Sequence, residues 1–199
     1  MKIIMVGTGY VGLVSGACFA EIGNKVLCID KDRKKIEDLN NGDIPIYEPG
    51  LEDLVKKNSD LGRLQFSHEL SENITGADVV FIAVGTPRGK EDGKADLRYV
   101  FEVAEELANL ISSETVVATK STVPVGTGKR VEKIINDMNS SINLSIASVP
   151  EFLREGYAVS DFMNPDRIII GTNSELAKNI LIKLHGPLLN FNEKKFIIT

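Results

Sequence analysis

The glycines of residues 7–12 have the spacing expected of a loop that cradles phosphates. The pattern G-x-G-x-x-G follows a short apolar run and reads Gly7-Thr8-Gly9-Tyr10-Val11-Gly12. Gly7 would permit a tight turn, Gly9 would let a pyrophosphate approach the backbone, and Gly12 would let a helix pack close to a sheet. Backbone amides from Tyr10 to Gly12 would point at the anion, helped by the helix dipole. This loop predicts a dinucleotide site.

Asp30 is the second residue of the predicted dinucleotide site, because it ends the next apolar run. Its carboxylate can accept hydrogen bonds from both ribose hydroxyls of an adenosine, and its charge would repel a 2′-phosphate. The residue therefore favours NAD over NADP. Several cations follow it closely and leave NADP open, since a cation there can serve a phosphate; they are Lys31, Arg33, Lys34 and Lys35.

Two later segments place hydroxyl groups directly after predicted strands. Thr86, in Gly85-Thr86-Pro87, can hydrogen-bond a ribose or a phosphate, or it can belong to a simple turn. Ser121 and Thr122 precede Val123-Pro124. They can position a ligand or a water molecule, or they can cap the helix that follows.

The segment Glu151-Phe152-Leu153-Arg154-Glu155 concentrates charge after a further predicted strand. Glu151 and Glu155 would share one face if this segment were helical. A carboxylate near a reacting centre can act as a general base through a water molecule, and Arg154 offers a planar donor fork for phosphate or carboxylate. The alternative is a helix N-terminus with acids favoured by its dipole. Arg167 adds a second guanidinium, which can pair with Asp161 or Asp166.

These loops need a scaffold that brings them to one edge, and the chain alternates predicted strands with predicted helices. Apolar runs predict strands at 3–6, 25–30, 64–67, 78–84, 115–119, 144–149, 168–171 and 196–198. Helical periodicity and capping residues predict helices at 11–22, 32–41, 51–55, 96–111, 128–138 and 175–184. The fold class is α/β: a Rossmann-like, doubly wound, mainly parallel sheet with helices on both faces. Ligands in such sheets bind beyond the carboxyl ends of the strands.

Composition narrows the class of protein. The 199 residues carry a net charge of -5 and 6% aromatic residues, which disfavours nucleic-acid binding. No apolar run is long enough to span a bilayer, so we expect no membrane insertion. Cys18 and Cys28 are too few for a disulfide framework and are expected to be buried thiols in a reducing cytoplasm. His68 and His185 lack the spacing of metal ligands, so no metal site is predicted.

Taken together and in order, the motifs of this chain resemble those of the UDP-glucose/GDP-mannose dehydrogenase family. The resemblance spans nearly all 199 residues. It rests on Gly7-Thr-Gly-Tyr-Val-Gly-Leu13, Asp30 with Lys35, Pro45-Ile-Tyr-Glu-Pro-Gly-Leu51, Val84-Gly-Thr-Pro87, Lys120-Ser-Thr-Val-Pro-Val-Gly126, Pro150-Glu-Phe-Leu-Arg-Glu-Gly156 and Pro165-Asp-Arg-Ile168.

The resemblance implies an oxidation that consumes two NAD molecules. A sugar 6-hydroxymethyl group would become an aldehyde, then a thioester on a cysteine, then a carboxylate, as in the conversion of UDP-glucose to UDP-glucuronate. The implied NAD contacts are Val11, Asp30, Lys35, Thr86, Thr122 and Glu155. The implied nucleotide-sugar contacts are Glu151 to Glu155, with Glu151 and Thr122 positioning the water and Glu151 acting as base. The resemblance also implies a cytoplasmic homodimer for the full-length protein.

One departure from the family pattern limits what this chain can do. The family's nucleophilic cysteine lies in a later domain, and neither Cys18 nor Cys28 has the sequence context to replace it. We therefore expect residues 1–199 to form the NAD-binding domain, without the central helix and substrate domain, and to be inactive alone. GDP-mannose and UDP-N-acetyl-mannosamine stay open as substrates, and so does a non-catalytic NAD-binding Rossmann module.

Overall fold

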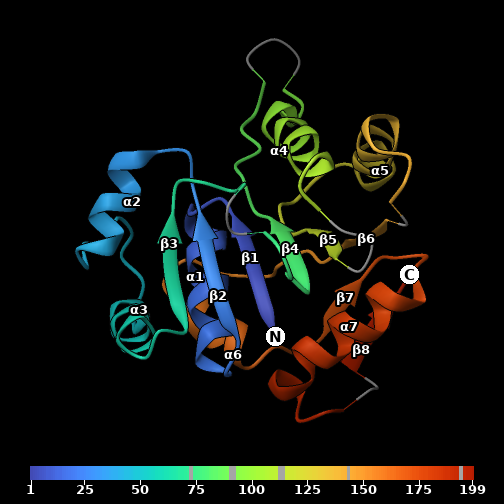
Figure 1. The fold of residues 1–199 in the computed structure, drawn as a ribbon. Helices are drawn as coiled ribbons and strands as arrows, with labels where there is room; N and C mark the ends of the chain where they lie inside the picture. The colour runs from blue at the N-terminus through green and yellow to red at the C-terminus, as the bar shows by residue number, and fades with distance from the viewer. Residues whose placement is uncertain (72–73, 90–92, 112–114, 143, 193–194) are drawn as a thin grey trace.

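A six-stranded parallel sheet forms the centre of the computed structural model, which describes residues 1–71, 74–89, 93–111, 115–142, 144–192 and 195–199. The strand order is β3-β2-β1-β4-β5-β6, and every neighbouring pair is parallel (Figure 1). The bounds are β1 (Lys2–Val6), β2 (Lys25–Ile29), β3 (Leu64–Ser67), β4 (Val79–Ile82), β5 (Val116–Thr119) and β6 (Ser145–Ser148). This order confirms the predicted Rossmann-like fold.

The helices are α1 (Tyr10–Glu21), α2 (Arg33–Asn40), α3 (Leu51–Asp60), α4 (Arg98–Ala108), α5 (Thr127–Met138), α6 (Ala158–Met163) and α7 (Glu175–His185), with a 3-10 turn at Gly186–Leu189. All six predicted helices are present. α4 is shorter than predicted, and Leu97 rather than Asp96 is its N-cap. The Asp96 carboxylate instead accepts hydrogen bonds from the amide and guanidinium of Arg98. α6 is not among the helices that the sequence pattern predicts.

Alternating strand residues divide the core into two layers, one on each face of the sheet. In β1, Ile3 and Met5 join the cluster that contains α1, α3, α6 and α7, whereas Ile4 and Val6 join the cluster that contains α4 and α5. This alternation is the period of two expected for a strand that is buried on both faces. Helices therefore cover both faces, as predicted (Figure 1).

The last two strands form a small sheet of their own. β7 (Ile168–Ile170) pairs in parallel with β8 (Phe196–Ile198), and α7 connects them. A single antiparallel bridge between Ser148 and Gly171 joins this sheet to the end of β6. None of the described helices combines the length and apolar character that a membrane crossing requires.

Candidate functional site

The glycine-rich loop has the geometry that its sequence pattern predicts. Gly7 has φ +105°, a conformation that side-chain-bearing residues rarely adopt. A Cβ on Gly12 would lie 1.9 Å from the Gly7 carbonyl oxygen, so α1 passes too close to the loop for any side chain there. A Cβ on Gly9 would have no other heavy atom within 4 Å. The backbone at Gly9 is therefore open to a ligand, and Tyr10 and Val11 follow it in the first turn of α1.

Asp30 lies beside this loop and is held by several donors. Its Oδ2 atom accepts hydrogen bonds from the Thr8 amide (3.0 Å), the Thr8 hydroxyl (2.7 Å) and the Lys35 ammonium (2.9 Å). Burial of Asp30 opposes its charged form, but these donors and the Asp32 amide outweigh it and lower the pKa to about 2. Oδ1 accepts a hydrogen bond from the Asp32 amide. A carboxylate oxygen can accept more than one hydrogen bond, so Oδ1 keeps lone-pair capacity for a ribose hydroxyl.

The cations that follow Asp30 are engaged with carboxylates. Lys35 pairs with Asp30 itself, Lys31 with Glu102 at 3.1 Å, and Lys34 with Asp38 at 2.8 Å. Three of the four cations that left NADP open thus already have anionic partners. The arrangement favours a ribose with a free 2′-hydroxyl group over a 2′-phosphate.

A cavity of about 580 Å³ extends from the glycine loop towards α4. Gly7, Gly9 and Asp30 line one side, and Gly85 and Tyr99 line another. It lies at the ends of β1 and β4, where the strand order of the sheet reverses. Open parallel sheets bind their ligands at this switch point. The cavity, the open backbone at Gly9 and the carboxylate of Asp30 together fit the adenosine and pyrophosphate of NAD.

Thr86 and Thr122 lie at neighbouring strand ends and contact each other. The Thr86 hydroxyl donates to the Thr122 carbonyl oxygen at 3.3 Å, and the Thr122 side chain is exposed. Ser121 is buried, and its hydroxyl donates to the Val84 carbonyl oxygen at 2.6 Å. This hydrogen bond joins the loop after β5 to the loop after β4. The sequence position of Ser121 did not indicate this structural role.

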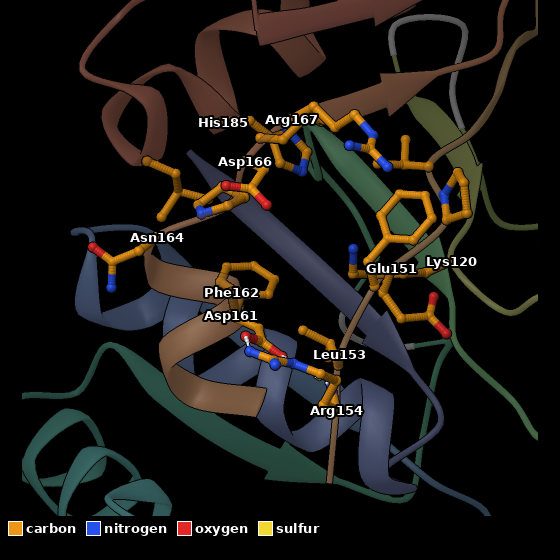
Figure 2. A pocket seen from close by; sticks show the side chains of 16 residues that line it. Lys120, Glu151, Leu153, Arg154, Asp161, Phe162, Asn164, Asp166, Arg167 and His185 are labelled. Carbon is orange, nitrogen blue, oxygen red and sulfur yellow. Dashed lines mark hydrogen bonds and ion pairs between the residues drawn. The ribbon is translucent and has the colours of Figure 1, made fainter. Parts of the chain in front are cut away.

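A second cavity, of about 310 Å³, lies between Glu151 and the segment that precedes β7. Glu151, Phe152, Leu153 and Arg154 line it together with the buried Lys120, which lies near Glu151 (Figure 2). Oε2 of Glu151 is buried and has no hydrogen-bond partner in the described structure. Burial raises the pKa of Glu151, and the nearby Lys120 charge lowers it by less. A carboxylate with a raised pKa and an unused oxygen is suited to accept a proton.

Residues 151–155 do not meet the condition under which Glu151 and Glu155 would share one face. Residues 151–154 are not helical, and Glu155 is exposed in a turn, so Glu151 and Glu155 do not share a helix face. Pro150 and Gly156 flank the segment, and Gly156 has φ +82°, which a helix cannot contain. Thr122 does not line the 310 Å³ cavity. Thr119 pairs with Ser148, however, so Thr122 and Glu151 each stand three residues beyond paired strand positions.

Arg154, and not Arg167, forms an ion pair with Asp161. Its guanidinium binds both oxygens of Asp161, with Nη2 to Oδ1 at 2.7 Å and Nε to Oδ2 at 3.0 Å (Figure 2). Arg167 lies over the Phe152 ring instead, 5.7 Å from its centroid. In this structure the donor fork of Arg154 is therefore directed at Asp161.

Lys120 and His185 are parts of this cavity that sequence reasoning missed. Lys120 is 3% exposed, and its ammonium lies 5.5 Å from the Phe162 ring centroid and 5.7 Å from that of Phe81. Burial lowers its pKa to about 8, although Glu151 raises it. Burial also lowers the pKa of His185 to about 3, so the ring is neutral. Its Nδ1 contacts the Leu181 carbonyl oxygen at 2.8 Å, and no partner is described for its buried Nε2.

The fold and the first cavity define a dinucleotide-binding α/β domain, and comparison with known proteins makes the assignment specific. Residues 1–189 match the model of the "UDP-glucose/GDP-mannose dehydrogenase family, NAD binding domain". The chain belongs to this family and contains its NAD-binding domain.

Relatives and solved structures agree with this assignment. A UDP-glucose 6-dehydrogenase from Rhizobium meliloti is 50% identical over 201 residues, covering 100% of this chain and 46% of the relative. One from Bacillus subtilis is 51% identical over 187 residues, covering 94% and 40%. A UDP-glucose dehydrogenase structure from Pyrobaculum islandicum matches with TM-score 0.91 and 37% identity, covering 100% and 46%. A GDP-mannose dehydrogenase structure from Pseudomonas aeruginosa matches with TM-score 0.90 and 32% identity, covering 100% and 45%. The chain thus spans less than half the length of these relatives.

Proposed function

We propose that this chain is the cofactor-binding part of an NAD-dependent dehydrogenase that oxidises UDP-glucose to UDP-glucuronate. The observation that carries the proposal is the placement of Glu151. Glu151 lines a cavity at the end of β6, and one of its carboxylate oxygens is buried without a hydrogen-bond partner in the described structure. A domain that only binds NAD does not need such a carboxylate.

NAD would occupy the cavity beside the glycine loop. Gly7, Gly9 and Gly12, with the amides of Tyr10 and Val11, would hold the pyrophosphate, and Asp30 with Lys35 would hold the adenosine ribose. The remaining proposed NAD contacts are Thr86, Ser121, Thr122 and Glu155. When bound, NAD would accept a hydride in each of the two oxidations.

Glu151 to Glu155 would hold the nucleotide sugar, with Phe152, Leu153 and Arg154 lining its cavity. Glu151 would take a proton from the water that hydrolyses the thioester, and Thr122 would help to position that water. Lys120 beside Glu151 supplies a buried positive charge that limits the rise of the Glu151 pKa. The balance leaves a carboxylate that is more basic than usual yet still able to ionise.

The comparisons favour UDP-glucose over the other sugars. UDP-glucose 6-dehydrogenases reach 50% and 51% identity, whereas the matched GDP-mannose dehydrogenase structure is 32% identical and a UDP-D-ManNAc dehydrogenase from Pyrococcus horikoshii is 27% identical. We further propose a cytoplasmic location, since two unpaired buried cysteines suit a reducing compartment, and a homodimer for the complete protein.

The test is turnover of the complete protein with each of the three nucleotide sugars, followed as NADH absorbance. We expect UDP-glucose to give two NADH per molecule and the highest kcat/KM. Glu151→Gln should release about two NADH per active site and then stall, because the oxidations precede the hydrolysis that needs the base. Glu132→Gln, an exposed carboxylate on α5, is the matched control. Steady turnover by Glu151→Gln at the wild-type rate would contradict the proposed role.

A further inference from the structure

Glu48 is a buried carboxylate in a largely exposed loop between α2 and α3. The Glu48 residue is 5% exposed, whereas the neighbouring Tyr47 is 91% exposed. The loop thus turns its aromatic ring to solvent and its charge inward, which is the reverse of the usual preference of these side chains. A buried charge needs strong hydrogen-bond donors around it.

Hydrogen-bond donors from two distant segments surround this carboxylate. The Tyr10 hydroxyl donates to Oε2 at 2.5 Å, and the Gly156 amide donates to the same oxygen at 2.8 Å. The Ala158 amide donates to Oε1 at 2.8 Å. Although burial opposes ionisation, these donors lower the pKa of Glu48, so the carboxylate is charged at neutral pH. Glu48 therefore joins the first turn of α1 to the beginning of α6.

The two segments joined by Glu48 belong to different ligands in the proposed function. Tyr10 immediately follows Gly9, where the backbone is open to the NAD pyrophosphate. Gly156 and Ala158 follow directly on the segment assigned to the nucleotide sugar. The Arg154–Asp161 ion pair shapes that segment, but it joins residues only seven positions apart. The Tyr10 hydroxyl also contacts the Arg154 carbonyl oxygen at 3.4 Å, which is a longer contact than its 2.5 Å hydrogen bond to Glu48.

We propose that Glu48 is a positioning residue that couples the NAD loop to the nucleotide-sugar segment at residues 151–155, through the Gly156 and Ala158 amides that follow it. The inference rests on the proposed function for the identity of the two ligands. A ligand that fixes the first turn of α1 also fixes the Tyr10 hydroxyl, and through Glu48 it restrains the Gly156 and Ala158 amides. The coupling is reciprocal, so each ligand strengthens the binding of the other.

A carboxylate suits this position because both of its oxygens must accept hydrogen bonds. Glutamine has one oxygen and one NH₂ group, so Glu48→Gln would set a donor against either the Ala158 amide or the Tyr10 and Gly156 donors. Tyr10→Phe is a narrower change, because it removes the hydroxyl and leaves both amide hydrogen bonds to Glu48 in place. The two variants separate the anchoring of the segment from its connection to the glycine loop.

The experiment is hydrogen–deuterium exchange of residues 156–159 in this chain, with and without saturating NAD, whose binding is measured separately by titration. In the wild type we expect NAD to slow exchange at least about fivefold, as for ordinary coupling between sites. In Glu48→Gln, the same amides should exchange at least about tenfold faster than in the wild type without ligand. NAD should change their exchange rate less than twofold. Glu52→Gln, an exposed carboxylate on α3, should behave as the wild type.

Tyr10→Phe decides whether Glu48 couples or only anchors. We expect its exchange without ligand to stay within about threefold of the wild type, since the amide hydrogen bonds remain, and we expect the NAD effect to be lost. The inference is overturned if NAD binds and slows exchange equally in the wild type and in Tyr10→Phe, or if NAD binds the wild type without slowing exchange. Failure of the wild type to bind NAD would overturn the proposed function and this coupling together.

Discussion

At the scale of single residues, Asp30 shows how one carboxylate can select a cofactor while it also supports the loop that binds it. Its Oδ2 atom is bonded to the glycine loop through Thr8 and to α2 through Lys35, and Oδ1 keeps acceptor capacity. The Lys35 cation is therefore paired with the carboxylate proposed to bind the ribose, and this pairing disfavours its use by a 2′-phosphate.

Asp30→Ala should weaken NAD binding clearly, because it removes the acceptor for the ribose hydroxyls. The relative loss for NADP should be smaller, since the same change frees Lys35 and removes a repelling charge. Titration of both cofactors checks this prediction, with Asp53→Ala on the exposed face of α3 as control. An equal loss for NAD and NADP would count against the ribose role.

The buried Lys120 should make the free energy of unfolding depend on pH in the alkaline range. Its pKa is about 8 in the folded chain against an ordinary value of 10.5, so the unfolded chain binds more protons between these values. The free energy of unfolding should therefore rise as the pH increases from 8 to 10.5, by up to about 3 kcal/mol from this group.

Urea unfolding of the wild type and Lys120→Met across this pH range isolates the Lys120 contribution. The difference in unfolding free energy between the two should shift in favour of the wild type as the pH rises. A difference that stays constant from pH 8 to 10.5 would show that Lys120 does not titrate in this range.

Residues with a local signature were predictable, and residues defined by distant contacts were not. Gly7, Gly9, Gly12 and Asp30 follow a fixed spacing along the chain, so the sequence alone locates them. The burial of Lys120 depends on aromatic rings from α1, β4 and α6, which no local pattern relates to it. The one available signal was a lysine directly after an apolar strand.

At the scale of elements, the junction of β1 and α1 contains two glycines with different roles. Gly12 is needed for the fold, and Gly9 is needed for the proposed ligand. A Cβ on Gly12 would meet the Gly7 carbonyl oxygen at 1.9 Å and the Ala83 Cβ at 3.3 Å. A Cβ on Gly9 would enter open space. The two positions differ by three residues and yet are constrained for different reasons.

Gly12→Ala should destabilise the chain by about 3 kcal/mol or more, because the backbone of Gly7 cannot move away. Gly9→Ala should change the melting temperature by no more than about 3 °C, yet weaken NAD binding at least tenfold by filling the space of the pyrophosphate. Calorimetry and NAD titration of both variants provide the check. Unchanged NAD affinity in Gly9→Ala would mean that the pyrophosphate lies elsewhere.

Elements were predictable where their own residues set them. All eight predicted strands are present, and those of the central sheet bury apolar residues on one or both faces. In β8, by contrast, Ile197 and Ile198 are exposed. The short helix α6 was missed because its first amides are satisfied by Glu48, which lies 110 positions away from Ala158. The pairing of β7 with β8 outside the main sheet likewise depends on where α7 packs.

At the scale of the whole molecule, the two cavities lie along the carboxyl ends of one continuous sheet. β1 and β4 supply the NAD cavity, and β5 and β6 supply the loops of Lys120 and Glu151. The proposed hydride transfer would thus take place across neighbouring strand ends. The chain's two cysteines are not placed for the thioester step, because both are buried and burial raises their pKa values to about 12.

The same buried cysteines can report on the unfolding of the chain. The Sγ atom of Cys28 in β2 would be only 2.5 Å from a Cβ on Gly16 of α1, so a thiol reagent reaches it only when helix and sheet separate. Labelling in native buffer should therefore follow unfolding, and NAD at one hundred times its Kd should slow it about a hundredfold. Labelling as fast as that of a free thiol, with or without NAD, would contradict this expectation. Ligand affinity can then be measured from a chemical rate, with no probe added to the protein.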